Sequence, residues 1–499
     1  MSGNLFSFLS AAVQRSDGPF IIPSGRAPIS FADAFAQAAK FANLLMARGV
    51  HPGDRVAVQV EKSPESLFLY LACLRTGAIY LPLNPAYTVN ELFHLLADSE
   101  PRLMVCSPAR ADSIRAIFSG PILTLGDDGA GTLIDESAAM PAGFHDAPVT
   151  SGDLAAILYT SGTTGRPKGA MLSHGNLQSN ATALKEEWRF TSSDVLLHAL
   201  PIFHTHGLFV ATNVALAGAA AMLFLPKFDP DAIFRCMPQA TVMMGVPTFY
   251  TRLLSDPRLS RATTAHMRLF ISGSAPLLAE THAQWQERTG HAILERYGMT
   301  ETNMNTSNPY EGARKPGSVG RALPGTEIRI AGDDGKTLPQ GEIGKILVRG
   351  PNVFTGYWRL PERTKEDFLP GGWFITGDMG MLDKDGYLFI VGREKDLIIT
   401  GGLNVYPKEI ETALDAIPGV DESAVFGLPH PDFGEGVTAV LVAKGGAKVT
   451  EEAVLAALKN QLANFKLPKR VMVLDEIPRN AMGKVQKNLL RARFQDLYR

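Results

Sequence analysis

Residues 159–170, YTSGTTGRPKGA, combine glycines, hydroxyl side chains and a lysine directly after the apolar run LAAIL. Glycine leaves backbone N–H groups free to point at an anion, and hydroxyls and a lysine can complete its shell. The spacing differs from G-x-x-x-x-G-K-[ST], so the ordinary P-loop of nucleotide hydrolases is excluded. The stretch predicts another kind of phosphate-binding loop, with a surface linker as the alternative. The predicted phosphate ligands are Thr160, Ser161, Gly162, Thr163, Thr164, Gly165 and Lys168.

Further polar groups follow other predicted strands, where ligands of α/β sheets gather. These groups are His206 in PIFHTHG, Arg252 in GVPTFYTR, Ser272 and Gly273 in SGSAP, and Tyr297, Thr300 and Glu301 in YGMTETN. Hydroxyls, amides and one carboxylate around a phosphate loop indicate a nucleotide site.

Later segments add candidates for the rest of a nucleotide. Glu301 could hold a magnesium ion that bridges phosphates, because this ion prefers oxygen ligands from one or two carboxylates. Asp378, in FITGD, could accept hydrogen bonds from ribose hydroxyls, and Arg393, in VGREKD, could donate to the same sugar. Lys484 stands in the glycine-containing turn PRNAMGK.

Composition limits the class of protein. A chain of 499 residues predicts two or more domains, and a net charge of −2 gives no overall reason to bind nucleic acid or an anionic membrane. Three cysteines without a C-x-x-C pair favour a reducing cytoplasm, and the first residues lack the pattern of a secretion signal. The uncharged stretch 207–226 is interpreted as a buried helix and strand rather than a membrane span.

The pattern of apolar runs predicts an α/β fold. Between residues 150 and 300, short apolar runs alternate with helical segments, which is typical of a parallel sheet covered by helices, and residues 30–106 show a similar rhythm. After Pro316, alternating strands around Asp-Gly turns predict a small antiparallel region that resembles a β-barrel. We expect a large domain of two helix-flanked sheets plus this β region over residues 1–394, and a small, mobile α+β domain over 395–499.

Five motifs together resemble one superfamily. YTSGTTGRPKGA, YGMTE, TGD, GREKD and PRNAMGK occur in the order found in adenylate-forming enzymes, which include acyl-CoA synthetases, luciferases and nonribosomal adenylation domains. The resemblance covers essentially the whole chain. Within the superfamily, HALPIFHTHGLFVATN, GVPTFYTRLL, SGSAPLLAETH and ERYGMTETNMNTSNPY look most like malonyl-CoA synthetases.

The resemblance implies an acid-thiol ligase that uses ATP, Mg²⁺ and coenzyme A in two steps. The acid first attacks the α-phosphorus of ATP, and the thiol of coenzyme A then displaces AMP. Thr300 would contact the α-phosphate and Tyr297 would pack by the adenine. Lys484 would bridge the carboxylate and the α-phosphate, so it should matter for adenylation and little for thioester formation.

The family pattern also implies a hinge at Lys395. Rotation there would exchange Lys484 for the loop around Gly401, Gly402 and Leu403, which would line a channel for the coenzyme A thiol. The last motif departs from the family pattern, because residues 480–482 are Asn-Ala-Met where Thr and Ser are usual.

The closer resemblance implies malonate as the acid. A second carboxylate in the acyl pocket needs a buried partner, and the family places the loops of His206 and Arg252 around that pocket. We assign Arg252 to the distal carboxylate, because its guanidinium can meet both oxygens, and His206 lines the same pocket. An exposed Arg252 paired with Asp256 is the alternative.

Other interpretations stay open at this point. His204 and His206 could bind a metal, and Tyr297 could be core packing. The ligase could act on another small, aryl or medium-chain acid, load a carrier protein in trans, or bind a nucleotide without catalysis. Small molecules are the expected partners, and a lysine acetyltransferase acting on Lys484 would abolish the first step by removing the cation.

Overall fold

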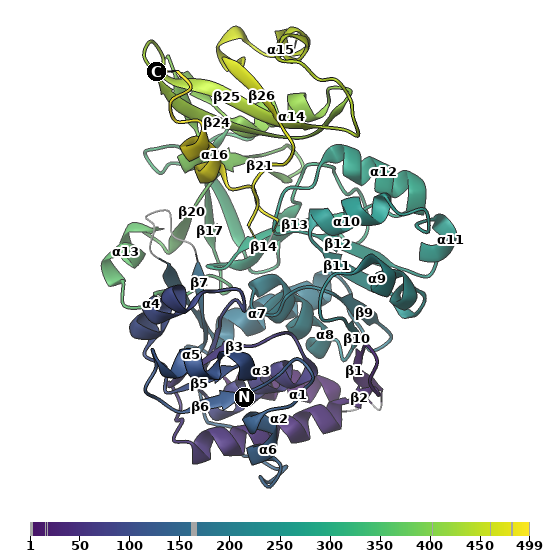
Figure 1. Cartoon of the computed structure of the whole chain (residues 1–499), viewed down its shortest axis with the longest axis vertical. Helices are drawn as coiled ribbons and strands as arrows, with labels where there is room; N and C mark the ends of the chain where they lie inside the picture. Colours follow the sequence, from purple (N-terminus) through teal and green to yellow (C-terminus); the bar gives the residue numbers. More distant parts are fainter. Residues whose placement is uncertain are drawn as a thin grey trace. The chain divides into compact units, whose positions relative to one another are not determined.

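A computed structural model describes residues 3–14, 16, 18–160, 167–401, 403–459, 461–480 and 483–498 (Figure 1). The chain divides into two compact units, unit 1 with Met1–Glu327 and Val348–Phe374, and unit 2 with Ile328–Leu347 and Ile375–Arg499. The boundary expected at Lys395 falls inside unit 2, because β21 (Leu388–Arg393) packs against α14 (Pro407–Asp415). The mixed α/β class expected from the sequence is confirmed.

The first sheet of unit 1 has nine strands in the order β15-β14-β13-β12-β11-β9-β10-β1-β2. Its parallel centre runs from β1 to β13, and β2, β14 and β15 add antiparallel edges. The strands are β1 (Pro19–Pro23), β2 (Ile29–Ser30), β9 (Val195–His198), β10 (Ala221–Phe224), β11 (Val242–Gly245), β12 (Leu269–Ser272), β13 (Leu294–Met299), β14 (Asn303–Ser307) and β15 (Arg321–Ala322).

The second sheet of unit 1 has seven strands in the order β18-β8-β7-β4-β3-β5-β6. These are β3 (Arg55–Gln59), β4 (Ile79–Pro82), β5 (Leu103–Cys106), β6 (Ile122–Thr124), β7 (Leu154–Thr160), β8 (Lys168–Ser173) and β18 (Gly356–Tyr357). The predicted strand LAAILYT is β7 to the residue. It pairs with β4 and β8, whereas β9 to β13 belong to the first sheet, so the region 150–300 is shared between two sheets instead of forming one.

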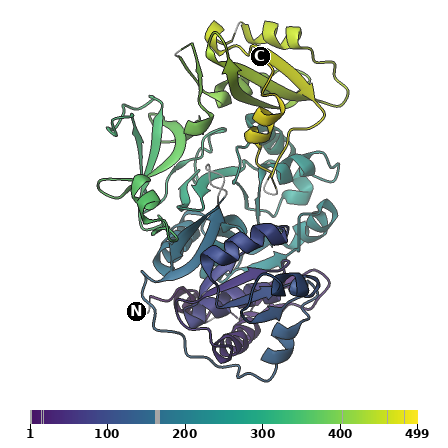
Figure 2. The same ribbon diagram turned by 60° about the vertical axis from the view of Figure 1, so that its left-hand side comes forward.

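Helices pack on both sheets of unit 1, and α2 lies against α3 (Figure 2). Among the described helices of unit 1, capping boxes fix the starts of four, for example at Ser63 with Ser66 for α3 and at Ser173 with Asn176 for α7. The helices are α1 (Leu5–Val13), α2 (Phe31–Ala47), α3 (Pro64–Thr76), α4 (Val89–Ser99), α5 (Ala111–Arg115), α6 (Thr132–Ser137), α7 (His174–Glu187), α8 (Asn213–Ala217), α9 (Pro230–Cys236), α10 (Pro247–Leu254), α11 (Arg261–Thr264), α12 (Ala279–Thr289) and α13 (Pro361–Glu366).

The uncharged stretch 207–226 lies in the core of unit 1. A π-helical turn, η2 (His206–Thr212), continues into α8 and then β10, and all the residues of these three elements are buried. This confirms a buried helix followed by a buried strand. Across the described residues, no helix has the length and apolar character needed to cross a membrane.

Unit 2 contains two sheets. The first lies mostly in this unit and is antiparallel, with the order β16-β17-β20-β19, and β21 also pairs with β20. The second has the order β23-β22-β25-β24, and β26 also pairs with β25. The strands are β16 (Glu327–Ala331), β17 (Gly344–Arg349), β19 (Phe368–Leu369), β20 (Trp373–Leu382), β22 (Ile398–Thr400), β23 (Leu403–Val405), β24 (Val420–His430), β25 (Gly434–Ala443) and β26 (Arg470–Leu474).

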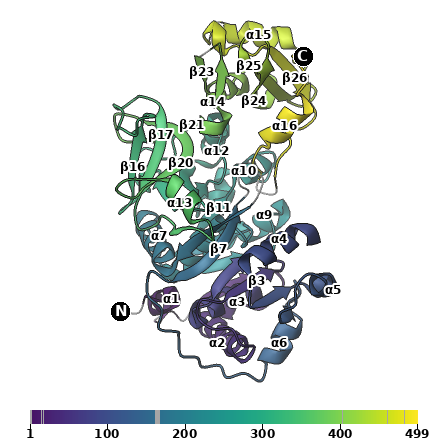
Figure 3. The same ribbon diagram turned by 90° about the vertical axis from the view of Figure 1, so that its left-hand side faces the viewer.

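Successive side chains of β24 and β25 point to opposite faces, and apolar residues on both faces give the second sheet of unit 2 two apolar faces. One face packs with α14 and α15 (Glu451–Lys459), and the other with α16 (Lys487–Arg493), as Figure 3 shows. Val425 and Leu441 belong to the first face, and Phe426 and Val440 to the second. The described residues after Lys395 therefore form cores of their own.

Candidate active site

The two ends of the predicted phosphate loop are paired strands. Thr160 ends β7 and Lys168 begins β8, and the two residues are antiparallel partners. This pairing closes the loop at its base and holds both residues at the end of the sheet. The predicted ligands Ser161, Gly162, Thr163, Thr164 and Gly165 lie outside the described residues.

Lys168 is held by two groups from a later part of unit 1. Its Nζ lies 3.9 Å from Oδ2 of Asp367 and 4.0 Å from the ring centre of Tyr357. Burial lowers the pKa of Lys168, and Asp367 partly opposes that shift. The cation is thus anchored at the loop base, where a phosphate would meet it.

Glu301 lies in the turn between β13 and β14 and is buried. The hydroxyl of Tyr357 donates a hydrogen bond of 3.1 Å to Glu301 Oε1, so Tyr357 touches both Glu301 and Lys168. No cluster of three His, Cys, Asp or Glu side chains suited to a metal occurs among the described residues. One buried carboxylate fits a magnesium ion that is held mainly by phosphate oxygens and water.

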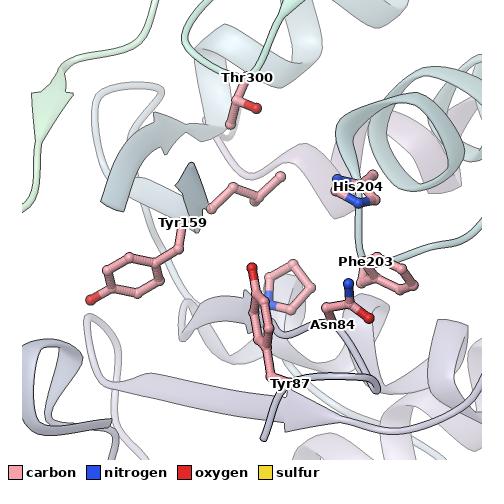
Figure 4. A pocket seen from close by; sticks show the side chains of 8 residues that line it. Asn84, Tyr87, Tyr159, Phe203, His204 and Thr300 are labelled. Carbon is pink, nitrogen blue, oxygen red and sulfur yellow. The ribbon is translucent and has the colours of Figure 1, made fainter. Parts of the chain in front are cut away.

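Thr300, from the same turn, lines a small cavity of about 20 Å³ with His204. Figure 4 shows Tyr87, Phe203, His204 and Thr300 around this space. Tyr297 is buried on β13 and precedes Thr300 in the chain. The β13–β14 turn therefore presents Thr300 to a cavity and Glu301 to Tyr357. Among the described residues, His204 and His206 have no third side chain that would complete a metal site.

His206 begins the π-helical turn and is 3% exposed. Its Nδ1 lies 3.2 Å from Oγ of Ser274, while Nε2 has no hydrogen-bond partner within the described structure. Burial, together with the charge of Arg296, keeps the pKa of His206 well below its usual value. The imidazole is therefore neutral at pH 7 and can offer a hydrogen bond rather than a charge.

Arg296, on β13, is a site residue that sequence reasoning missed. It is 3% exposed, and its Nε and Nη2 are buried with no hydrogen-bond partner among the described residues. Burial lowers the pKa of Arg296 to about 9, so the group still carries its charge at pH 7. An unpaired buried guanidinium costs several kcal/mol unless an anion joins it. The available signal was the pair of adjacent charged residues, Glu295 and Arg296, that directly follows the apolar residues AIL.

The expected substrate residues Ser272 and Gly273 lie beside this guanidinium. A Cβ added to Gly273 would stand 2.4 Å from Cζ of Arg296, so glycine makes room for the side chain. Ser272 is buried, and its Oγ lacks a partner in the described part of the chain. Arg296, His206 and Ser272 thus bring buried polar atoms that lack partners among the described residues into unit 1, as a binding site for a small anion requires.

The structure does not bury Arg252. This residue lies on the exposed face of α10, whose buried face is formed by Tyr250 and Leu253. The suggested pairing with Asp256 is not formed either, because Asp256 Oδ2 accepts from Arg258 Nη2 at 2.6 Å. The expectation of a buried Arg252 is wrong, since helical periodicity turns position 252 away from the core.

Unit 2 brings the predicted ribose ligands together. Asp378 on β20 and Arg393 on β21 are antiparallel partners, and Arg393 Nε lies 2.6 Å from Asp378 Oδ1. Arg393 is therefore already oriented by the carboxylate that would accept the ribose hydroxyls. Lys395 is exposed in a short 3₁₀ turn, η4 (Glu394–Asp396).

The predicted coenzyme A loop is the tip of a hairpin. Thr400 pairs with Leu403 across the turn between β22 and β23, and Gly401 adopts a φ of 57° there, which favours glycine. Leu403 is 48% exposed, which is unusual for its type. Gly402 lies outside the described residues.

Lys484 sits in a turn that Asn480 closes. The backbone N–H of Asn480 donates to the carbonyl of Lys484 at 2.9 Å, and the N–H of Lys484 donates to Asn480 Oδ1 at 3.0 Å. The asparagine found in place of the usual residue thus supplies hydrogen bonds to the turn. Although the residue is exposed overall, protein atoms around its ammonium lower the pKa of Lys484 to about 8, and Arg393 adds repulsion.

Comparison with known proteins agrees with this arrangement. The family model described as AMP-binding enzyme matches residues 8–358, and the model for the AMP-binding enzyme C-terminal domain matches 409–484. A feruloyl-CoA synthase from Amycolatopsis sp is 38% identical over 94% of this chain and 95% of its own. The malonate–CoA ligase of Arabidopsis thaliana is 37% identical over 89% of this chain and 78% of its own.

A solved structure is similar over its whole length. The crystal structure of ATP-bound MatB from Rhodopseudomonas palustris is 58% identical, has a TM-score of 0.98 and covers 100% of both chains. The family models, the relatives and the described fold all agree. The chain therefore belongs to the AMP-binding enzyme family, and it is an acid–CoA ligase of the adenylate-forming superfamily.

Proposed function

We propose that this protein joins malonate to coenzyme A at the expense of ATP. A malonate oxygen attacks the α-phosphorus, the bond to the β-phosphate breaks, and malonyl adenylate and pyrophosphate form. The thiol then attacks the malonyl carbonyl, the bond to AMP breaks, and the thiol proton is lost to solvent. Malonyl-CoA and AMP are the products.

The observation that carries this proposal is the unpaired guanidinium of Arg296. A pocket for an apolar acid gains nothing from a buried charge, whereas the second carboxylate of malonate would neutralise it. The neutral His206 lies close enough to Arg296 for the guanidinium charge to lower the pKa of His206, and its Nε2, which has no partner within the described structure, would be available to the same carboxylate. We therefore assign the distal carboxylate to Arg296 and His206 rather than to Arg252.

Several relatives support an acid with a second polar or charged end. The solved MatB structure is 58% identical, and named relatives include a malonate–CoA ligase, an oxalate–CoA ligase from Arabidopsis thaliana at 36% identity and a sulfoacetate–CoA ligase from Cupriavidus necator at 35% identity. Malonate, oxalate and sulfoacetate all carry two anionic groups. Each would present one to ATP and the other to a buried cation.

The first half-reaction uses positive charge to offset the repulsion of two anions. Thr160, Lys168 and the loop between them would hold the β- and γ-phosphates, and Thr300 would donate to the α-phosphate. Asp378 and Arg393 would hold the ribose. Lys484 would bridge the attacking carboxylate and the α-phosphate.

Magnesium fits the residues around Glu301. This buried carboxylate, oriented by Tyr357, would hold an ion that also binds phosphate oxygens. The ion would neutralise charge on the departing pyrophosphate. Tyr297 would pack near the base of the nucleotide.

The second half-reaction is assigned to the hairpin tip of unit 2. Gly401 and Leu403 would contact the pantetheine arm of coenzyme A, and Lys395 would be the hinge that separates the two half-reactions. We propose that Lys484 has no part in the thioester step.

The adenylation rate is expected to fall as pH rises through about 8. The charged form of Lys484 is the active one, and its lowered pKa means that the ammonium is lost above that pH. Pyrophosphate exchange followed between about pH 6.5 and 9.5 checks this. A malonyl adenylate supplied ready-made separates this loss from effects on the thioester step. A rate that stays level to the highest pH would contradict the assignment.

A panel of acids read by pyrophosphate release tests the substrate. Malonate should give the highest kcat/KM, with oxalate and sulfoacetate slower and butyrate lower by about a hundredfold or more, because butyrate leaves the cation unpaired. Brisk turnover of butyrate or ferulate with indifference to malonate would reject malonate while leaving the ligase chemistry intact.

A ligase for aryl acids is the second candidate. The feruloyl-CoA synthase and an indoleacetate–CoA ligase from Aromatoleum aromaticum, both 38% identical, favour it. Ferulate and indoleacetate belong in the same panel for this reason. Free coenzyme A as the acceptor distinguishes either ligase from a carrier-loading enzyme, which would release adenylate without making the free thioester.

A further inference from the structure

A lysine is buried in unit 1 without a carboxylate. Lys62 precedes α3 and is 8% exposed, and within the described residues no Asp or Glu forms an ion pair with it. Its Nζ lies 2.9 Å from His198 Nδ1, 2.8 Å from the carbonyl oxygen of His198 and 4.2 Å from the ring centre of Phe224. Two hydrogen-bond acceptors and one aromatic face thus surround the ammonium group, which has three N–H donors.

The contacts of His198 determine which of its nitrogens carries the proton. Nε2 lies 2.9 Å from the carbonyl oxygen of Gly207, which can only accept, so Nε2 is the donor. In the neutral ring Nδ1 is then an acceptor, and Lys62 donates to it. Burial lowers the pKa of both groups, which agrees with a neutral imidazole at the end of β9.

Gly207 connects this pair to the acyl site, because it follows His206 in the π-helical turn. Its carbonyl also accepts a hydrogen bond of 3.1 Å from Thr212 Oγ1. A Cβ at position 207 would stand 2.0 Å from the carbonyl oxygen of Pro201, so this backbone is closely enclosed. Fixing the Gly207 carbonyl fixes the direction in which the preceding residue, His206, projects.

We propose that Lys62 is a positioning residue that acts through His198 and Gly207 to hold His206 in the acyl site. The chain of contacts runs from Lys62 Nζ to His198 Nδ1 and from His198 Nε2 to the Gly207 carbonyl. Lys62 itself does not touch substrate in this role. The inference depends on the proposed place of His206, and it does not depend on malonate being the acid.

The test compares Lys62→Met, His198→Gln and the double variant. Methionine keeps the length of the lysine stem, and glutamine keeps a donor toward Gly207 but loses the Nδ1 acceptor. Each single variant should raise KM for the acid about tenfold or more and leave KM for ATP within about twofold, because one buried hydrogen bond is lost. The double variant should be little worse than either single one, because both remove the same link.

Tyr70→Phe is the matched control. It removes another buried hydrogen bond of unit 1, between the Tyr70 hydroxyl and Asn213 Oδ1 at 3.2 Å. This variant should lower the melting temperature by a similar amount without changing the KM for the acid. Multiplicative effects in the double variant, equal changes in both KM values, or the same KM change in Tyr70→Phe would overturn the proposal.

A replacement variant and a prior assay of the wild-type enzyme ensure that each outcome supports or overturns the proposal. If Lys62→Met fails to fold, Thr212→Val tests the same carbonyl and should raise the KM for the acid by a smaller factor, while an unchanged KM would count against the proposal. The wild-type enzyme is first assayed with the acid panel, and the variants are compared on its best acid. If the wild-type enzyme does not turn over malonate, the substrate assignment is refuted, and the role of Lys62 is judged separately from the variants on the best acid.

Discussion

Replacing Lys484 by alanine is expected to slow formation of the acyl adenylate by about a hundredfold to a thousandfold. In the proposed mechanism the ammonium would stand between two anions that repel each other, and its loss would raise the barrier of that step alone. Pyrophosphate exchange measures the first half-reaction, and release of thioester from ready-made acyl adenylate measures the second. The second rate should stay within about twofold of wild type.

Lys487→Ala is the matched control for this experiment. Lys487 is a lysine three residues further along in unit 2, where its Nζ lies 2.7 Å from Glu411 Oε1. Lys487→Ala removes one positive charge, as Lys484→Ala does, but it should leave the rate of pyrophosphate exchange unaffected. If Lys484→Ala slows both half-reactions to the same extent, the assignment to adenylation is wrong.

Replacing Arg296 by methionine is expected to lower kcat/KM for malonate by about a thousandfold. Methionine fills part of the space without a charge, so the distal carboxylate of malonate would be buried unpaired. Butyrate has no such group, and its kcat/KM should be kept or increased. Initial rates of pyrophosphate release with both acids measure this change in selectivity.

Arg252→Met is the control for Arg296 and also tests the earlier interpretation of the sequence. Because Arg252 is exposed on α10, its replacement should change the selectivity for malonate over butyrate by less than about twofold. A large loss of malonate activity in Arg252→Met, with little in Arg296→Met, would restore the original assignment and contradict the structural one.

Local patterns in the chain were sufficient for much of the fold. The strand LAAILYT, followed by a glycine- and threonine-rich loop and Lys168, is readable because alternation of apolar runs and turn residues is a local property. The sequence also assigned Asp378 and Arg393 to the same sugar, although it did not predict their pairing with each other. Their motifs, TGD and GREKD, occupy facing positions on two neighbouring strands joined by an Asp-Gly turn.

The choice of sheet for each strand was not a local property. β7 pairs with β4 from an early part of the chain and with β8, and neither pairing is fixed by the rhythm of residues 150–300. Likewise, the compact units join residues 328–347 with 375–499, although the change in composition is at 392–407. Long-range contacts decide such divisions, and one sequence without its fold does not display them.

The amino acid sequence by itself determined the chemistry of the nucleotide site, because glycines, hydroxyls and charged groups at fixed spacing limit what a loop can bind. Only the tertiary structure decided which arginine is buried, and therefore which one we propose to face the acid. Arg252 is turned to solvent by the helix that carries it, whereas Arg296 is enclosed beside Gly273, and its Nε and Nη2 have no hydrogen-bond partner among the residues that the structure describes. Burial and the absence of a partner arise from distant segments packing together, and these two properties make a charge available to a ligand.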